Sequence, residues 1–212
     1  PAIAALDAQI EGWVAGLQLA ALSLQNHANP AALIANLSGN HHFILSYLTT
    51  EVLHQLTPQR QEFLLETSVL TRLSGDLCDA VTGRSGSGVL LDELYATNVF
   101  VIPLDDEHRW YRYHHLFADL LRHQLRQTQP ARDLLLNQRA SAWYEAQGVA
   151  LDAVEYALAA ADYPRVVRLL EAHARAVVLQ GYAQTVESWL RRLPEEWRLA
   201  GPRANLAFGW SL

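Results

Sequence analysis

Apolar residues recur at helical spacing along most of this chain. Residues 42–56 place their apolar side chains on one face of an amphipathic helix. The pair Thr57-Pro58 follows, and a proline at the first helical position is a typical start signal. Shorter helical stretches are expected at residues 76–81 and 89–96. The pattern therefore predicts a mainly α-helical chain.

One segment departs from the helical spacing. Residues 99–104 are apolar and rich in β-branched side chains, an acidic turn follows at 105–107, and residues 109–113 are rich in aromatics. Two such runs separated by a short polar turn predict a β-hairpin. From His115 the apolar residues return to helical spacing. The hairpin should therefore deliver His114 and His115 to the first turn of a helix.

The start of that helix is suited to anions. The first backbone N–H groups of a helix have no partner inside it and carry a partial positive charge, so phosphate groups bind there readily. A histidine at this place can add one more donor. Three helices, a two-stranded wing and a longer helix are the element order of a winged-helix domain.

A repeat begins after Gln129-Pro130. Gly148 and Gly181 are 33 residues apart, and so are Tyr156 and Trp189. This spacing is close to the tetratricopeptide period. In such repeats the helix pairs stack on one another, because a single pair cannot bury its apolar face alone. The chain is therefore expected to end in the first repeats of a tetratricopeptide-like α-superhelix.

Composition narrows the function classes. The chain is 50% hydrophobic and 18% charged, so it can bury a sizeable core, and its net charge of −6 argues against non-specific nucleic-acid binding. A single cysteine, Cys78, cannot form an internal disulfide, which fits a reducing, cytoplasmic compartment. The apolar run at 14–24 is too short to span a membrane. The absence of methionine and a start inside a helical pattern suggest a segment of a larger protein.

The string Trp-Tyr-Arg-Tyr-His-His-Leu-Phe at residues 110–117 resembles the MalT-like, LuxR-type transcriptional activators, which are ATP-binding regulators of the STAND class. The string lies where that class carries a Met-His-Asp motif, in a winged-helix domain that closes over the nucleotide. The resemblance implies that His114 contacts the β-phosphate of bound ADP. His115 replaces the Asp of the motif and Tyr113 its Met, and Arg112 belongs to the same candidate site.

A second resemblance lies near the start of the chain. Gly-Leu-Gln-Leu at residues 16–19 is similar to the Gly-Leu-Pro-Leu motif that opens the helical domain after the nucleotide-binding domain. In the family this loop lies near the adenine, which implies cofactor contacts for Gly16 and Gln18, with Gln18 where other members have proline. Without the resemblance, the string is a packed core helix.

Together these observations predict a regulatory segment that is not itself an enzyme. Residues 1–56 would be a helical subdomain, 57–127 a winged-helix domain, and 128–212 the first repeats of a sensor superhelix. By the resemblance, ATP or ADP is held mainly by an upstream domain outside this chain. The same resemblance implies a small-molecule inducer on the repeats, self-association in the active state, and DNA contact through another domain.

Several alternatives stay open. His114 could be a helix-capping or core histidine that packs on Tyr111 or Phe117. The chain could be a helical-repeat interaction scaffold without nucleotide contact. A DNA-binding winged helix is a third possibility, although the acidic turn at 105–107 would repel phosphate.

Three further chemistries are set aside. The glycine-rich residues 83–88 lack the preceding strand and the Gly-Lys-Ser/Thr ending of a phosphate loop. The histidines at 41–42, 114–115 and 123 have no partner at metal-ligand spacing. Cys78 has no nearby histidine, so no catalytic nucleophile is expected.

Overall fold

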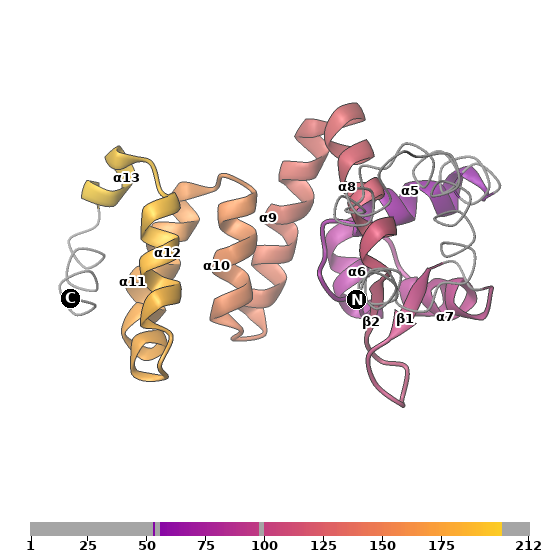
Figure 1. Cartoon of the computed structure of the whole chain (residues 1–212), viewed down its shortest axis with the longest axis horizontal. Coiled ribbons are helices and arrows are strands. Elements are labelled where there is room, and N and C mark those ends of the chain that lie inside the picture. Colours follow the sequence, from indigo (N-terminus) through magenta and orange to yellow (C-terminus); the bar gives the residue numbers. More distant parts are fainter. Residues whose placement is uncertain (1–52, 54–55, 98–99, 201–212) are drawn as a thin grey trace, which may run out of the picture. The chain divides into compact units, whose positions relative to one another are not determined.

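A computed structural model describes Leu53 and residues 56–97 and 100–200. These residues are mainly helical, with one two-stranded antiparallel sheet (Figure 1). They form two compact units. The first comprises the described residues up to Gly75 together with Gly86–Thr128, and the second comprises Asp76–Ser85 and the described residues from Gln129 onward. Asp76–Ser85, which lie inside the range expected for the winged-helix domain, are thus grouped with the later helices.

The first unit begins with helix α5 (Pro58–Thr67). Thr57 caps this helix by accepting a hydrogen bond from the backbone N–H of Arg60, and Pro58 occupies the first turn, so the predicted start signal is confirmed. Helix α6 (Gly75–Thr82) and helix α7 (Ser87–Ala96) follow in the chain at the positions that the apolar pattern predicts. Of these two helices, α7 belongs to the first unit, whereas α6 after Gly75 belongs to the second.

The predicted hairpin is confirmed, although its strands are shorter than the apolar runs. Strand β1 (Val101–Pro103) pairs antiparallel with strand β2 (Tyr111–Tyr113), with Ile102 opposite Arg112. The wing between them closes where the Asp105 carboxylate accepts a hydrogen bond from the Arg109 backbone N–H at 2.8 Å. Leu73, which precedes α6, pairs with β2 through an isolated antiparallel β-bridge. In this bridge Leu73 and Tyr111 exchange two backbone hydrogen bonds.

Helix α8 (His115–Thr128) returns from the wing and packs on α5. Its start at His115 coincides with the change of period in the sequence. The apolar faces of these elements form one core, whose fully buried members include Phe63, Leu64, Leu91, Leu94, Phe117 and Leu121. Two polar contacts cross it: Thr67 Oγ1 and the Tyr113 hydroxyl lie 2.6 Å apart, and Arg122 Nε donates to the Ser68 carbonyl at 2.8 Å.

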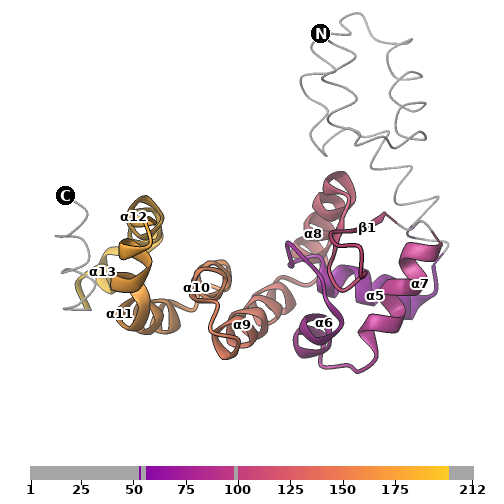
Figure 2. The same ribbon diagram turned by 90° about the horizontal axis from the view of Figure 1, so that it is seen from below.

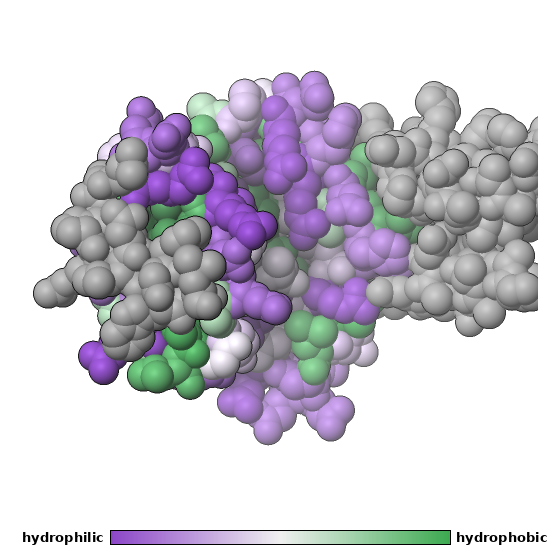
Figure 3. Space-filling model, turned by 60° about the vertical axis from the view of Figure 1, so that its left-hand side comes forward, coloured by the Kyte–Doolittle hydropathy of each residue, from purple (hydrophilic) through white to green (hydrophobic). Residues whose placement is uncertain are grey.

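The second unit contains two successive helix pairs, seen almost end-on in Figure 2. The first pair is α9 (Pro130–Ala146) with α10 (Ala150–Ala159), and the second is α11 (Tyr163–Leu179) with α12 (Ala183–Arg192). Every bound of the second pair lies 33 residues after the corresponding bound of the first. A short helix, α13 (Glu195–Ala200), follows. On the face drawn in Figure 3, hydrophilic residues make up most of the coloured surface.

The turns inside the two pairs are built alike. Gly148 (φ +73°) and Gly181 (φ +94°) both adopt the left-handed conformation. The residue after each glycine donates a backbone hydrogen bond into the preceding helix, from Val149 to Tyr144 and from Tyr182 to Val177. This is the Schellman arrangement, and it gives the 33-residue spacing of the glycines a physical cause.

The conformation at these turns makes a testable contrast. Gly148→Ala and Gly181→Ala should each lower the free energy of unfolding by about 1 kcal/mol, because an added Cβ meets no atom within 4 Å and only the positive φ opposes it. Ala161, which has φ +52° after α10, should respond with the opposite sign to Ala161→Gly. Thermal and urea unfolding measure both.

Gly88→Ala provides the control for this series. Gly88 lies inside α7 without a positive φ, and an added Cβ would meet only ordinary contacts there. Helix propensity should therefore make this change neutral or stabilising. Equal destabilisation at Gly88 and Gly148 would contradict the conformational explanation.

Candidate functional site

The predicted site lies where strand β2 passes into helix α8. The backbone N–H of His114 donates to the Phe100 carbonyl at 2.8 Å. The His114 carbonyl accepts the N–H of Ala118 at 2.9 Å, which is the first hydrogen bond of the helix. His114 is therefore the capping residue, fixed by its backbone to the neighbouring end of β1.

The imidazole of His114 is buried, with only 3% of the residue exposed. Its ring stacks on His115, with centroids 4.6 Å apart, and meets the Phe100 ring nearly edge-on at 6.2 Å. Phe117 then packs on Phe100 at 5.1 Å. His114 thus packs in the aromatic layer beneath α8, while His115 is partly exposed.

Phe100 is the contact that sequence reasoning missed. Its φ of +53° is uncommon for a residue with a side chain and costs about 1–3 kcal/mol. The packing of its ring on Phe117 and the hydrogen bond from its carbonyl to His114 hold it there. No sequence signal marks a positive φ at phenylalanine, because glycine, asparagine and aspartate are the usual occupants.

Arg112 lies on β2, two residues before His114. It is partly buried, and its Nη1 lies 3.5 Å from the Tyr113 carbonyl oxygen. The structure therefore brings three predicted residues, Arg112, His114 and His115, to one strand–helix junction. The other two, Gly16 and Gln18, lie outside the described residues.

The strand that carries Arg112 is anchored by Tyr111. Its ring is 2% exposed, and its hydroxyl donates to the Asp92 carboxylate on α7. Burial, together with this hydrogen bond to Asp92, raises the pKa of Tyr111 far above its ordinary value. The phenol therefore stays neutral, and β2 is tied to α7 and to Leu73 at once.

The donors of this junction suit an anion. The first turn of α8 offers backbone N–H groups and contains no acidic side chain. His115 and Arg112 are nearby along the chain and partly exposed. The described residues contain no group of three or more His, Cys, Asp or Glu placed to hold a metal ion. A phosphate group is therefore a better fit to this donor set than a cation.

The comparisons with known proteins identify the region. Residues 49–133 match the family model described as the MalT winged helix domain. This segment is a MalT-type winged-helix domain. The element order of the matched residues, three helices followed by the wing and α8, agrees with it. The matched model is a winged-helix domain and not a catalytic one.

Full-length relatives resemble almost the whole chain. The chain is 34% identical over 209 residues to the serine/threonine-protein kinase PknK of Mycobacterium tuberculosis, covering 99% of the chain and 19% of the relative. It is 30% identical over 204 residues to the HTH-type transcriptional regulator MalT of Vibrio cholerae, and the match covers 95% of the chain and 22% of the relative. It is 28% identical over 207 residues to MalT of Vibrio parahaemolyticus, and that match covers 97% of the chain and 23% of the relative. This MalT-like chain thus spans about a fifth of these relatives.

Two further observations concern the surroundings of the MalT-type domain. No helix among the described residues is both long and apolar enough to cross a bilayer. Helix α7, which takes the place of the DNA-reading helix in a helix-turn-helix, contains no Lys or Arg and exposes Asp92 and Glu93. The exposed surface of α7 is therefore negatively charged, whereas contacts to DNA phosphates require positive charge.

Proposed function

We propose that this MalT-like chain is the regulatory segment of an ATP-dependent, inducer-responsive transcription regulator. In this proposal residues 1–56 are a helical subdomain, 57–127 the winged-helix domain and 128–212 the first sensor repeats. The winged helix senses whether ADP or ATP is bound to an upstream domain, and the repeats respond to a small-molecule inducer. Self-association and DNA contact through other domains complete the response.

The observation that carries this proposal is the sharing of one segment by relatives with different outputs. The same region aligns with a protein named as a kinase and with proteins named as transcriptional regulators. A segment common to both supplies neither phosphoryl transfer nor DNA reading by itself. A role that fits both kinds of relative is to regulate the activity of the other domains in the same protein.

The β2–α8 junction is the proposed sensing site. When ATP or ADP is bound, its phosphates supply negative charge. His114, His115 and Arg112 would face that charge together with the first-turn N–H groups of α8. Because the His114 backbone is held at both ends, a change at this site is passed directly to the wing and to α8. A hydrogen bond to a charged group contributes about 1.5–3 kcal/mol, a bias of about tenfold to 150-fold between two states.

The test is the nucleotide content of the full-length protein. Wild type, His114→Ala and His123→Ala would each be purified and denatured, and the released ADP and ATP counted per chain. His123 is an exposed histidine of the same helix and is the matched control. We expect wild type and His123→Ala to carry ADP, and His114→Ala to lose it or to activate without inducer.

A second variant of His114 separates sensing from folding. Because His114 is buried, its alanine variant leaves a cavity, so His114→Asn, which keeps a polar side chain of similar size, is measured alongside by thermal unfolding. If His114→Ala folds and retains the ADP content and inducer dependence of wild type, His114 is a structural capping residue and the sensing role is wrong.

The second candidate function is an interaction scaffold built on the helix pairs. The burial of the His114 ring between Phe100 and His115 favours it, because this is the environment of a core histidine. A full-length protein that neither carries nucleotide nor binds any when ATP or ADP is added would support this alternative.

A further inference from the structure

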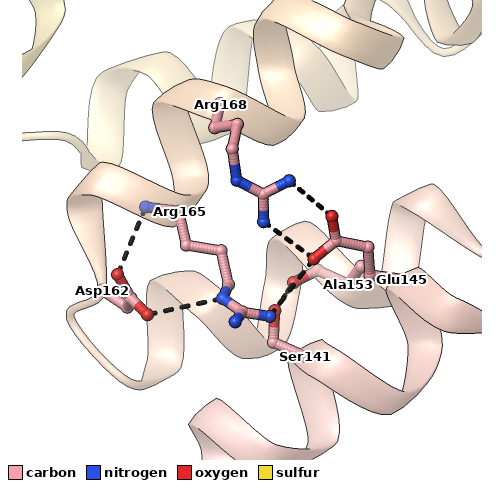
Figure 4. A network of polar contacts seen from close by, with 6 residues as sticks. All are labelled: Ser141, Glu145, Ala153, Asp162, Arg165 and Arg168. Carbon is pink, nitrogen blue, oxygen red and sulfur yellow. Dashed lines mark hydrogen bonds and ion pairs between the residues drawn. The ribbon is translucent and has the colours of Figure 1, made fainter.

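Two carboxylates of the first helix pair hold the second pair. Glu145, near the end of α9, accepts hydrogen bonds from Nη1 and Nη2 of Arg168 on α11, at 2.5 and 2.8 Å (Figure 4). It also accepts one from Arg165 at 3.2 Å. Arg168 is the main cause of the lowered pKa of Glu145, so this carboxylate is ionised at neutral pH.

Glu155 on α10 makes the second connection. One of its oxygens accepts the indole N–H of Trp189 at 2.6 Å, and the other accepts Arg192 Nη1 at 2.7 Å. Both donors lie on α12. Each helix of the first pair thus contributes one carboxylate, and each helix of the second pair contributes two donors. We call these two contacts the Glu145 clamp and the Glu155 clamp.

The clamps do not recur with the repeat. The positions 33 residues after Glu145 and Glu155 are Val178 and Ser188, which have no carboxylate. The donor side does recur in part, because Arg198 on α13 lies 33 residues after Arg165. The joint between α12 and α13 therefore has a donor in place but lacks both of the acceptors that hold the joint between α10 and α11.

We propose that the two clamps make α9 to α12 a single rigid body and that helix α13, after Leu193-Pro194, is free to pivot against it. Both clamps lie within the second unit, so this proposal is independent of whether His114 senses nucleotide. Buried apolar side chains hold every joint of such an array, but the hydrophobic effect is not directional. Charged hydrogen bonds at two separate points of a joint oppose its rotation, because their geometry is directional.

The first test removes the clamps and measures amide hydrogen exchange along the 212-residue chain. In the double variant Glu145→Gln with Glu155→Gln, amides of α11 and α12 should exchange about tenfold faster, while those of α9 and α10 change much less. Glu187→Gln is the control, because Glu187 pairs with Arg191 inside α12 and crosses no joint. Equal acceleration in both helix pairs, or none in α11 and α12, would overturn the proposal.

The indole N–H of Trp189 gives a second readout of the first test. Its exchange reports the Glu155 clamp directly, because this N–H donates to Glu155. In Glu155→Ala, which removes both acceptor oxygens, it should exchange severalfold faster than in wild type and in Glu187→Gln. Unchanged protection would mean that the burial of Trp189 alone excludes water, which would remove the Glu155 clamp from the proposal.

The second test installs a clamp where the chain lacks one. Val178→Glu places a carboxylate at the position equivalent to Glu145, with Arg198 equivalent to Arg165. Amides of α13 should then exchange about threefold to tenfold more slowly. The protection should disappear in Val178→Glu with Arg198→Ala, and should not arise in Val178→Gln. If Val178→Gln protects α13 equally, or if no variant does, the missing carboxylate does not set the freedom of this joint.

Discussion

Replacing Phe117 with alanine is expected to lower the free energy of unfolding by about 3–5 kcal/mol. Phe117 is fully buried, and its ring lies 5.1 Å from that of Phe100 and 6.0 Å from that of Tyr113. Alanine removes this whole contact surface and leaves a cavity between α8 and the hairpin. Guanidinium unfolding followed by circular dichroism measures the loss.

Phe117→Leu is the matched control for this prediction. Leucine fills most of the same volume, so it should cost less than about 1.5 kcal/mol. The comparison also tests the architecture of the candidate site. Phe117 supports Phe100, whose carbonyl holds the His114 N–H, so Phe117→Ala should reproduce any nucleotide loss seen in His114→Ala. A stability loss below about 1 kcal/mol for Phe117→Ala would show that this aromatic layer does not support the junction.

The local features of the fold could be predicted from the sequence because their causes are local. The change of period at His115, the start signal at Thr57-Pro58 and the glycine spacing each reflect backbone hydrogen bonding within a few residues. The family string at 110–117 added the winged-helix assignment, which the match over residues 49–133 supports. The strands came out shorter than expected because Phe100, with φ +53°, directly precedes β1 and the side chain of Asp105 closes the wing.

The features that escaped prediction are long-range or conformationally unusual. Nothing in the spacing of Asp92 and Tyr111, or of Glu155 and Trp189, indicates that each pair shares a hydrogen bond. Such pairs form only when separate elements are brought together, and many polar pairs in the sequence are equally possible. The candidate site shows the same limit. The sequence placed His114 at a helix start, but the burial of its ring depends on Phe100, whose positive φ leaves no pattern in the sequence.

Trp189→Ala should have an effect of similar size, about 3–5 kcal/mol, in the second unit. Trp189 is 1% exposed and occupies the position 33 residues after Tyr156, which stacks on Tyr144 at 5.3 Å. The tryptophan both fills the core of its helix pair and donates to Glu155. Urea unfolding of the variant, followed by circular dichroism, measures the combined loss.

Trp189→Phe separates the two contributions. Phenylalanine retains most of the apolar contact but loses the N–H donor, so it should cost about 1–3 kcal/mol and leave the Glu155 clamp with Arg192 alone. Trp143→Phe, at a partly buried tryptophan of α9, should cost less. If Trp189→Phe is as stable as wild type, the indole hydrogen bond contributes nothing to stability, and the connection between the helix pairs relies on apolar packing and the Glu145 clamp.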